Sequence, residues 1–75
     1  MIPNNFEDFK NEIMTKANLR PPDWRLGQAV YNYTYEMYPD CARKSQLKSR
    51  IDCFYDSRKI DDFLQECWKY YNTVN

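Results

Sequence analysis

The chain has 75 residues, with eleven Lys or Arg, eleven Asp or Glu and a net charge of zero. A chain of this length forms one domain, here residues 1–75, and its balanced charge gives no general attraction to nucleic acid or membranes. No apolar run approaches the about 20 residues of a membrane span, so we expect no membrane partner. Seven Tyr, four Phe and two Trp are many for this size, and such large rings suit a small core or a binding surface.

The residues that most catalytic sites require are missing. The sequence has no His and a single Gly, which removes histidine-based catalysis, histidine metal ligands and glycine-rich phosphate loops. The cysteines, Cys41, Cys53 and Cys67, form no Cys-x-x-Cys pair, and we expect buried thiols in a reducing compartment. The sequence therefore predicts no enzyme, no catalytic residue, no cofactor and no metal site. Because the N-terminal residues lack signal-peptide features, we expect a cytoplasmic protein.

The first helix is predicted over residues 5–18. Asn4 or Asn5 can cap it by accepting backbone N–H bonds. The apolar residues that follow recur at helical spacing on one stripe, at Phe6, Phe9, Ile13 and Ala17. Pro21 and Pro22 then hold the chain in an extended conformation.

A second helix is predicted over residues 23–38. Asp23 can cap its start, and Pro39 makes helical geometry unfavourable at Tyr38. Its apolar positions fall together on one side and are expected to face the core: Leu26, Ala29, Val30, Tyr33 and Met37. Gly27 costs the helix roughly 1 kcal/mol relative to Ala, which makes sense if another backbone approaches closely there.

Residues 39–56 carry the weakest pattern and are expected to be irregular or short-helical, with Leu47, Ile51 and Phe54 as anchors on the core. The last helix is predicted over 57–73, capped by Asp56 or Ser57. It has the clearest helical spacing in the chain, at Ile60, Phe63, Leu64, Cys67, Trp68 and Tyr71. The fold class that follows is all-α, a small three-helix domain.

Three tyrosines of the second helix, Tyr31, Tyr35 and Tyr38, fall on a stripe nearly opposite its apolar positions. One interpretation is that this helix is central and that both stripes are core. The other is an exposed tyrosine strip that binds a second copy, a partner protein or nucleic-acid bases. The pattern by itself leaves both open.

A polar stripe lies between those two stripes and contains Arg25, Gln28 and Asn32. Its amides can hold the backbone of the 51–56 segment, which would be a structural role. Alternatively, guanidinium and amide groups can read base edges or the backbone of a partner.

The segment 43–50 is basic, with Arg43, Lys44, Lys48 and Arg50 and no acidic residue. It is either a solvated turn facing the acidic last helix or a patch that binds phosphate or acidic groups. With zero net charge, nucleic-acid binding through it would be weak and sensitive to salt.

Two motifs carry a resemblance to a known group of proteins. They are Arg25-Leu26-Gly27-Gln28-Ala29-Val30-Tyr31-Asn32 and Asp52-Cys53-Phe54-Tyr55-Asp56, followed by Ile60 and Phe63. Over about residues 24–65 the chain resembles short proteins of bacteriophages and bacterial mobile elements. Cys53 stands where proline is common in that group. The resemblance implies a phage or mobile-element setting and brings no known activity. We also expect the Gln28 and Asn32 amides to hold the 52–56 turn as one structural unit.

These features favour a non-catalytic protein-interaction module. Its partner would be a host protein that it inhibits or modulates, or a second copy in a homodimer. The alternative is a small nucleic-acid-binding regulator that uses Arg25, Gln28, Asn32 and the basic segment. A virion or assembly component is a third, weaker hypothesis.

Overall fold

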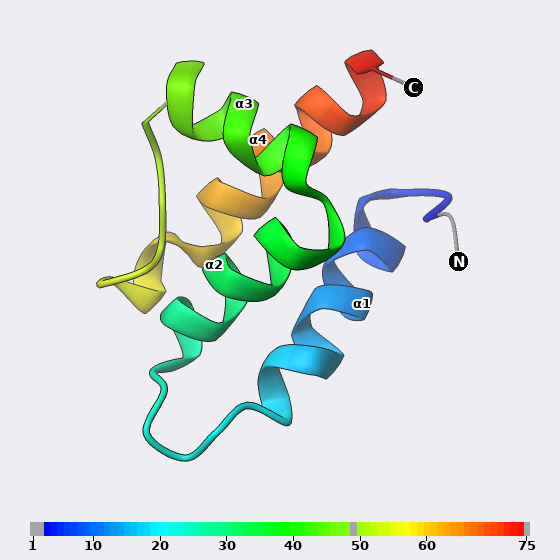
Figure 1. Ribbon diagram of the computed structural model, residues 1–75. Coiled ribbons are helices and arrows are strands. Elements are labelled where there is room, and N and C mark those ends of the chain that lie inside the picture. The colour runs from blue at the N-terminus through cyan, green and yellow to red at the C-terminus, as the bar shows by residue number, and fades with distance from the viewer. Residues whose placement is uncertain (1–2, 49, 75) are drawn as a thin grey trace.

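Helices make up most of the chain in the computed structural model, which describes residues 3–48 and 50–74 (Figure 1). The described part contains four α-helices and one short 3-10 helix, and no strand. The elements in chain order are α1 (Phe6–Asn18), α2 (Leu26–Met37), α3 (Pro39–Lys48), η1 (Ser57–Lys59) and α4 (Ile60–Val74). The predicted all-α fold class is confirmed, whereas three helices was one too few.

Most helix ends follow local sequence signals. The side chain of Asn5 accepts a hydrogen bond from the backbone N–H of Asp8 at 2.9 Å and caps α1. The carboxylate of Asp56 accepts from the N–H of Arg58 at 3.0 Å and caps η1, which runs directly into α4. Pro39 ends α2 and occupies the first position of α3, where the missing N–H costs nothing.

The start of α2 differs from the prediction. The helix begins at Leu26 and not near residue 23. Asp23 lies in a turn closed by a hydrogen bond from the N–H of Trp24 to the carbonyl of Pro21 at 3.0 Å. At the actual start of the helix, the side chain of Gln28 reaches back and accepts from the backbone N–H of Arg25 at 3.2 Å.

Within the segment predicted to be irregular or short-helical, residues 39–48 form a ten-residue helix. The buried residues of α3 are Cys41, Ala42 and Ser45. These small side chains let α3 lie close to α4, but they give a weak hydrophobic signal, which is why the sequence pattern predicted no more than an irregular or short-helical segment here. Residues 50–56 are non-helical, which is one of the two forms expected for that segment.

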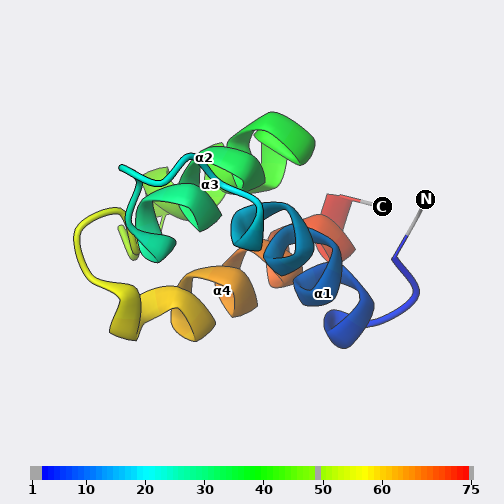
Figure 2. The same cartoon turned by 90° about the horizontal axis from the view of Figure 1, so that it is seen from below.

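The helices are arranged around α2, which packs against α1 on one side and α3 on the other. α4 packs mainly on α3 and also on α1, so the four helices enclose one core (Figures 1 and 2). The radius of gyration of 11.2 Å matches the about 11 Å expected for a compact chain of this length. No helix in the described part is both long and apolar enough to cross a membrane.

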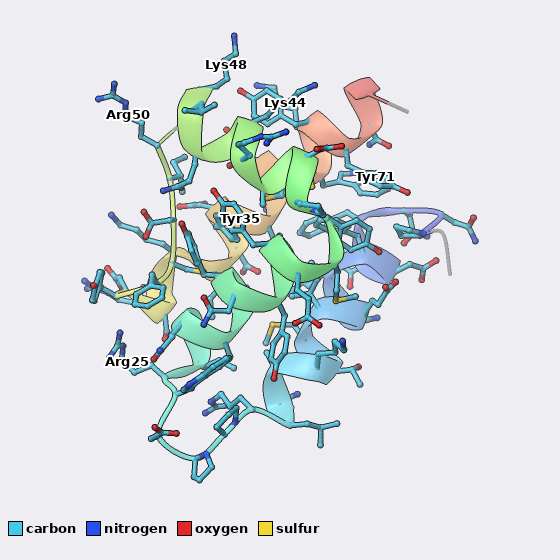
Figure 3. All side chains as sticks on the ribbon, in the orientation of Figure 1. Arg25, Tyr35, Lys44, Lys48, Arg50 and Tyr71 are labelled. Atoms are coloured by element: carbon cyan, nitrogen blue, oxygen red, sulfur yellow. The ribbon has the colours of Figure 1, made fainter. Side chains whose placement is uncertain are left out.

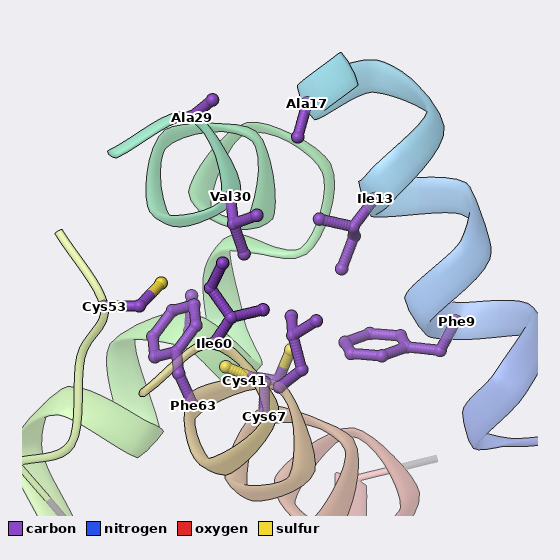
Figure 4. Packing of buried hydrophobic residues seen from close by; sticks show 12 residues of the cluster. Phe9, Ile13, Ala17, Ala29, Val30, Cys41, Cys53, Ile60, Phe63 and Cys67 are labelled. Carbon is purple, nitrogen blue, oxygen red and sulfur yellow. The ribbon is translucent and has the colours of Figure 1, made fainter. Parts of the chain in front are cut away.

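The core is formed by the predicted faces of α1 and α4 and by residues of the other helices (Figure 4). Phe9, Ile13 and Ala17 of α1 are fully buried. On α2, Ala29 and Val30 are also fully buried, whereas the predicted core residues Leu26, Tyr33 and Met37 are partly exposed at its edge. The other buried apolar residues are Cys41, Ala42, Cys53, Ile60, Phe63, Leu64 and Cys67.

Thr34 is a core residue that hydrophobic spacing did not predict. It is fully buried, and its hydroxyl donates to the carbonyl of Val30 at 2.6 Å. That internal hydrogen bond removes the cost of burying the hydroxyl and allows a polar residue on the inner face of α2.

Candidate functional site

The tyrosines of α2 pack on the core and do not form an exposed strip. Tyr31, Tyr35 and Tyr38 are each half-buried and in contact with core residues. The ring of Tyr31 stacks on Phe63 of α4 at 5.7 Å between centroids, and the ring of Tyr38 lies 4.9 Å from that of Phe9. Because α2 has neighbours on two sides, both its apolar stripe and its tyrosine stripe pack against other parts of the molecule, as the core interpretation predicted.

The environment of these hydroxyls is chemically inert. Burial and a hydrogen bond with Tyr31 raise the pKa of Tyr35 to about 12. Burial, followed by the nearby carboxylate of Glu12, raises the pKa of Tyr38 still further. Both groups therefore stay protonated at neutral pH and cannot act as bases or nucleophiles there.

Gly27 explains how the turn after α3 is attached to α2. A Cβ atom on Gly27 would overlap the carbonyl oxygen of Cys53, so the two backbones are in direct contact. The thiol of Cys53 donates to the carbonyl of Gly27 at 3.2 Å, and the N–H of Gly27 donates to Oγ of Ser57 at 3.1 Å. The predicted close backbone approach at Gly27 is confirmed, and it fixes residues 53–57 against the first turn of α2.

This turn presents two aromatic rings beside an arginine. Nη2 of Arg25 donates to the carbonyl of Phe54 at 3.3 Å. Its guanidinium carbon lies 5.7 Å from the ring centroid of Phe54 and 5.3 Å from that of Tyr55, within the range of cation–π contact. The side chain of Tyr55 is 83% exposed. We call Arg25, Tyr31, Phe54 and Tyr55 the aromatic–arginine surface.

An open depression of about 280 Å³ lies in this surface, lined by Tyr31, Asp52, Phe54 and Tyr55. Small-molecule sites are usually enclosed and measure about 300–1,000 Å³, so this depression suits one side chain of a partner better than a free ligand. Asp52 on its wall is held in place by two hydrogen bonds, from the N–H of Phe54 and from Nε2 of Gln46, each at 3.2 Å.

The polar stripe of α2 serves the fold in a different way from the one predicted. The Gln28 side chain accepts from the N–H of Arg25, the residue that precedes α2. The 52–56 turn is held by the guanidinium of Arg25 and by the Gly27 backbone, and not by the Gln28 amide. Asn32 is half-buried. Of the three predicted residues of the polar stripe, only Arg25 belongs to the aromatic–arginine surface.

Phe54 and Tyr55 are the residues of this site that were not among the predicted binding candidates. Phe54 was predicted as a core anchor, and Tyr55 was only part of the Asp52–Asp56 motif. The available signal was that neighbouring side chains of an extended segment point to opposite sides, so Phe54 and Tyr55 cannot both face the core. Phe54 is half-buried and Tyr55 is exposed.

The basic residues lie on the outer side of α3 and just beyond it. Arg43 pairs with Asp40 of the same helix at 3.2 Å. Lys44, Lys48 and Arg50 are exposed and form no ion pair with any other residue in the described part of the chain. Residue 49 of the predicted basic segment lies outside the described residues. We call Lys44, Lys48 and Arg50 the basic end of α3 (Figure 3).

The acidic last helix is not the partner of this basic end. Asp61 at the start of α4 pairs with Lys10 of α1 at 2.6 Å, and Glu66 pairs with Lys69 at 3.9 Å. The predicted solvated turn is a helix up to Lys48, its basic side chains are exposed as expected for a solvated segment, and none of them pairs with a described acidic residue of α4. Leu47, predicted to anchor this segment, is 71% exposed, because α3 turns Cys41, Ala42 and Ser45 inward in its place.

Acidic and polar side chains gather on the other side of the molecule. A depression of about 540 Å³ runs along α1 and is lined by Asp8, Asn11, Glu12 and Thr15. It has no aromatic ring or arginine among these lining residues, the types that most often dominate binding energy.

All three cysteines are free and buried. A hydrogen bond with Cys67 lowers the pKa of the Cys41 thiol. Burial raises the pKa of the Cys53 thiol to about 12, so it is protonated and unreactive at neutral pH. Among the described residues there is no group of three or more Cys, Asp or Glu side chains placed to hold a metal ion.

Comparison with known proteins found no matching family model, no matching curated protein and no matching solved structure. Function must therefore be argued from the geometry of the surface itself.

Proposed function

We propose that this protein is a non-catalytic protein-interaction module that binds its partner through the aromatic–arginine surface. The observation that carries the proposal is Tyr55, whose ring is 83% exposed beside the guanidinium of Arg25 and the 280 Å³ depression. Exposing a large ring has no benefit for folding. Tyr and Arg are the residue types most enriched among those that dominate protein–protein binding energy.

The rigidity of this surface supports the same conclusion. The turn that carries Tyr55 is tied to α2 by the Gly27 backbone and by Arg25, and its Asp52 is fixed by two hydrogen bonds. A surface already held in one conformation loses little entropy when a partner binds. An unsupported loop would lose more.

The partner we propose is a host protein in the cytoplasm, which this chain inhibits or modulates. Support for the setting comes from the resemblance of the Arg25–Asn32 and Asp52–Asp56 motifs to phage and mobile-element proteins. A homodimer through the same surface is the second form of this proposal, since Tyr55 and the depression beside it can serve as knob and hole between two copies.

Affinity capture from host lysate tests the proposal with two matched variants. Tyr55→Ser removes the exposed ring of the surface. Leu19→Ser removes a similarly exposed apolar side chain, 80% exposed, at the end of α1. We expect wild type and Leu19→Ser to retain the same protein and Tyr55→Ser to lose it, with all three unfolding at similar temperatures. A partner that Tyr55→Ser retains contradicts the proposal.

Sedimentation separates the two forms of the proposal. A homodimer through this surface dissociates in Tyr55→Ser and persists in Leu19→Ser. A wild-type protein that is monomeric and also captures nothing that depends on Tyr55 contradicts both forms.

A further inference from the structure

The basic end of α3 is a second exposed feature, whose charged side chains form no ion pair with the described part of the chain. Lys44 and Lys48 are one helical turn apart and therefore share a face. In Figure 3 they point away from the molecule at the same end as Arg50. None of the three forms an ion pair with another described residue. Three unneutralised cations at one end of a short helix are an electrostatic binding surface.

Arg50 occupies a backbone conformation that Arg disfavours. Its φ of 57° lies in the left-handed region, and its N–H donates to the carbonyl of Ser45 at 3.1 Å to close the end of α3. Gly or Asn adopts this conformation at lower cost than Arg. Arg at this position costs stability, and its exposed side chain makes no compensating ion pair within the described chain.

Leu47 adds an apolar group to the same face. It lies three residues after Lys44 and one before Lys48, and its side chain is 71% exposed. A surface that combines cations with a central apolar side chain matches a ligand that combines anions with an apolar group. Protein segments rich in Asp and Glu with an interspersed apolar residue have that composition.

We propose that the basic end of α3, together with Leu47, binds an acidic, apolar-containing segment of the partner protein. This inference rests on the proposed function, because the partner is the one bound at the aromatic–arginine surface. The 50–56 segment joins the two surfaces, with Arg50 at one end and Arg25 near the other (Figure 3). One extended segment of a partner can therefore contact both.

Nucleic acid fits this surface less well. Three cations neutralise about three phosphates, which leaves weak and strongly salt-dependent binding. Leu47, whose side chain is 71% exposed, offers nothing to a phosphate backbone, whereas it can pack against an apolar residue of a peptide.

The test is selection of a random linear peptide library against four forms of the full chain. These are wild type, the triple variant Lys44→Gln/Lys48→Gln/Arg50→Asn, Tyr55→Ser and the control Lys69→Gln, which removes an exposed cation on α4. We expect wild type and Lys69→Gln to enrich peptides with several Asp or Glu and one large apolar residue. Synthetic copies of these peptides should bind the triple variant roughly tenfold more weakly, with weaker binding to wild type at higher salt.

Thermal unfolding of each variant shows whether a loss of peptide binding comes from a loss of folding. Because Asn relieves the left-handed conformation, Arg50→Asn alone should unfold at the same or a higher temperature while it loses peptide affinity. Enriched peptides that are neutral or basic, or that bind the triple variant as well as wild type, overturn the inference. Tighter binding of a single-stranded or duplex oligonucleotide or of phosphatidylserine vesicles to the same residues also overturns it.

The outcomes also separate this inference from the proposed function. Peptides that depend on Tyr55 but not on the basic end leave the proposed function standing and overturn the inference. A library that enriches nothing dependent on Tyr55 or on the basic end overturns both.

Discussion

Two aromatic clusters lie at the two ends of α2 and differ in what surrounds them. Near its C-terminal end, Tyr38 meets Phe9 of α1 and Tyr71 of α4, and Trp68 completes the group, with ring centroids 4.9 to 6.0 Å apart. Near its N-terminal end, Tyr31 meets Phe54 edge-on at 5.4 Å, and Phe54 meets Tyr55 at 4.8 Å. The first cluster joins α1, α4 and the end of α2. The second joins α2 to the turn and, through the stacking of Tyr31 on Phe63, to α4, but its outermost ring, Tyr55, is exposed.

A ring stabilises the fold only if elements on all its sides supply contacts. Phe9 is fully buried because three helices meet around it. Tyr55 lies on a turn that has the protein on one side and solvent on the other. Similar residue types therefore serve stability at one end of α2 and remain free for binding at the other.

The first prediction concerns the centre of the helix-joined cluster. Phe9→Ala should lower the free energy of unfolding by about 3–5 kcal/mol, since it removes a fully buried ring and leaves a cavity. For a domain with a small core this loss approaches the total stability. Urea denaturation followed by circular dichroism measures it. A loss below about 1 kcal/mol would show that the cluster is not the structural one.

The second prediction concerns the contact that fixes the turn. Gly27→Ala should destabilise the protein by about 1–3 kcal/mol, because the new Cβ overlaps the carbonyl of Cys53 and the backbone must move. The gain of roughly 1 kcal/mol in helix propensity offsets part of this cost. Ala29→Gly, at a buried helical site two residues later, is the comparison for propensity. If Gly27→Ala raises the unfolding temperature, the close approach at the turn is absent.

The third prediction concerns pH. The Cys53 thiol has a pKa of about 12 in the folded chain against an ordinary value of 9, so the folded state keeps a proton that the unfolded state releases. The contribution of this thiol to the free energy of unfolding is fully present below pH 9. It falls as the pH rises toward 12, by up to about 1.4 kcal/mol per pH unit. The raised pKa of Tyr35, about 12 from 10, adds to the fall above pH 10.

Urea midpoints from pH 7 to pH 11 measure this decline. Cys53→Ala is the control, since it removes this thiol and should reduce the slope between pH 9 and pH 10. Part of the slope remains, because the pKa of the buried Cys67 thiol is also raised and its proton is likewise released on unfolding. Equal slopes in wild type and Cys53→Ala would show that the thiol is not buried against Gly27.

The fourth and smallest effect on stability is expected at the exposed ring. Tyr55→Ser should change the free energy of unfolding by less than about 0.5 kcal/mol, because the side chain is 83% exposed. Differential scanning calorimetry of this variant beside Phe9→Ala compares the two clusters directly. A loss of 2 kcal/mol or more, the size seen for buried rings, would place Tyr55 in the fold and remove the basis of the proposed binding surface.

Much of the fold could be predicted because the signals were local. Asn5, Pro39 and Asp56 mark helix ends through their own backbone preferences and side-chain hydrogen bonds, and α1 and α4 each have one apolar stripe. The buried residues of α3 could not be recognised in the same way. Cys41, Ala42 and Ser45 are buried because α4 lies against them, and small residues carry little hydrophobic signal of their own.

The candidate site could be predicted only in part, for a related reason. The sequence singled out α2 and the basic segment after it, but it could not decide which faces of α2 are covered. Tyr31 and Tyr38 became core when α4 and α1 packed against them. Arg25 stayed exposed and acquired Phe54 and Tyr55 as neighbours from a segment about 30 residues away.

The sequence by itself determined the all-α class, the ends of most helices and the inner faces of α1 and α4, because propensity, capping and periodicity act over a few residues. It also excluded histidine-based chemistry by composition. The tertiary structure alone decided which tyrosines are buried, why Gly27 must lack a side chain and which cations remain without partners. These are properties of segments that meet only after folding, and no local pattern records which segment will cover another.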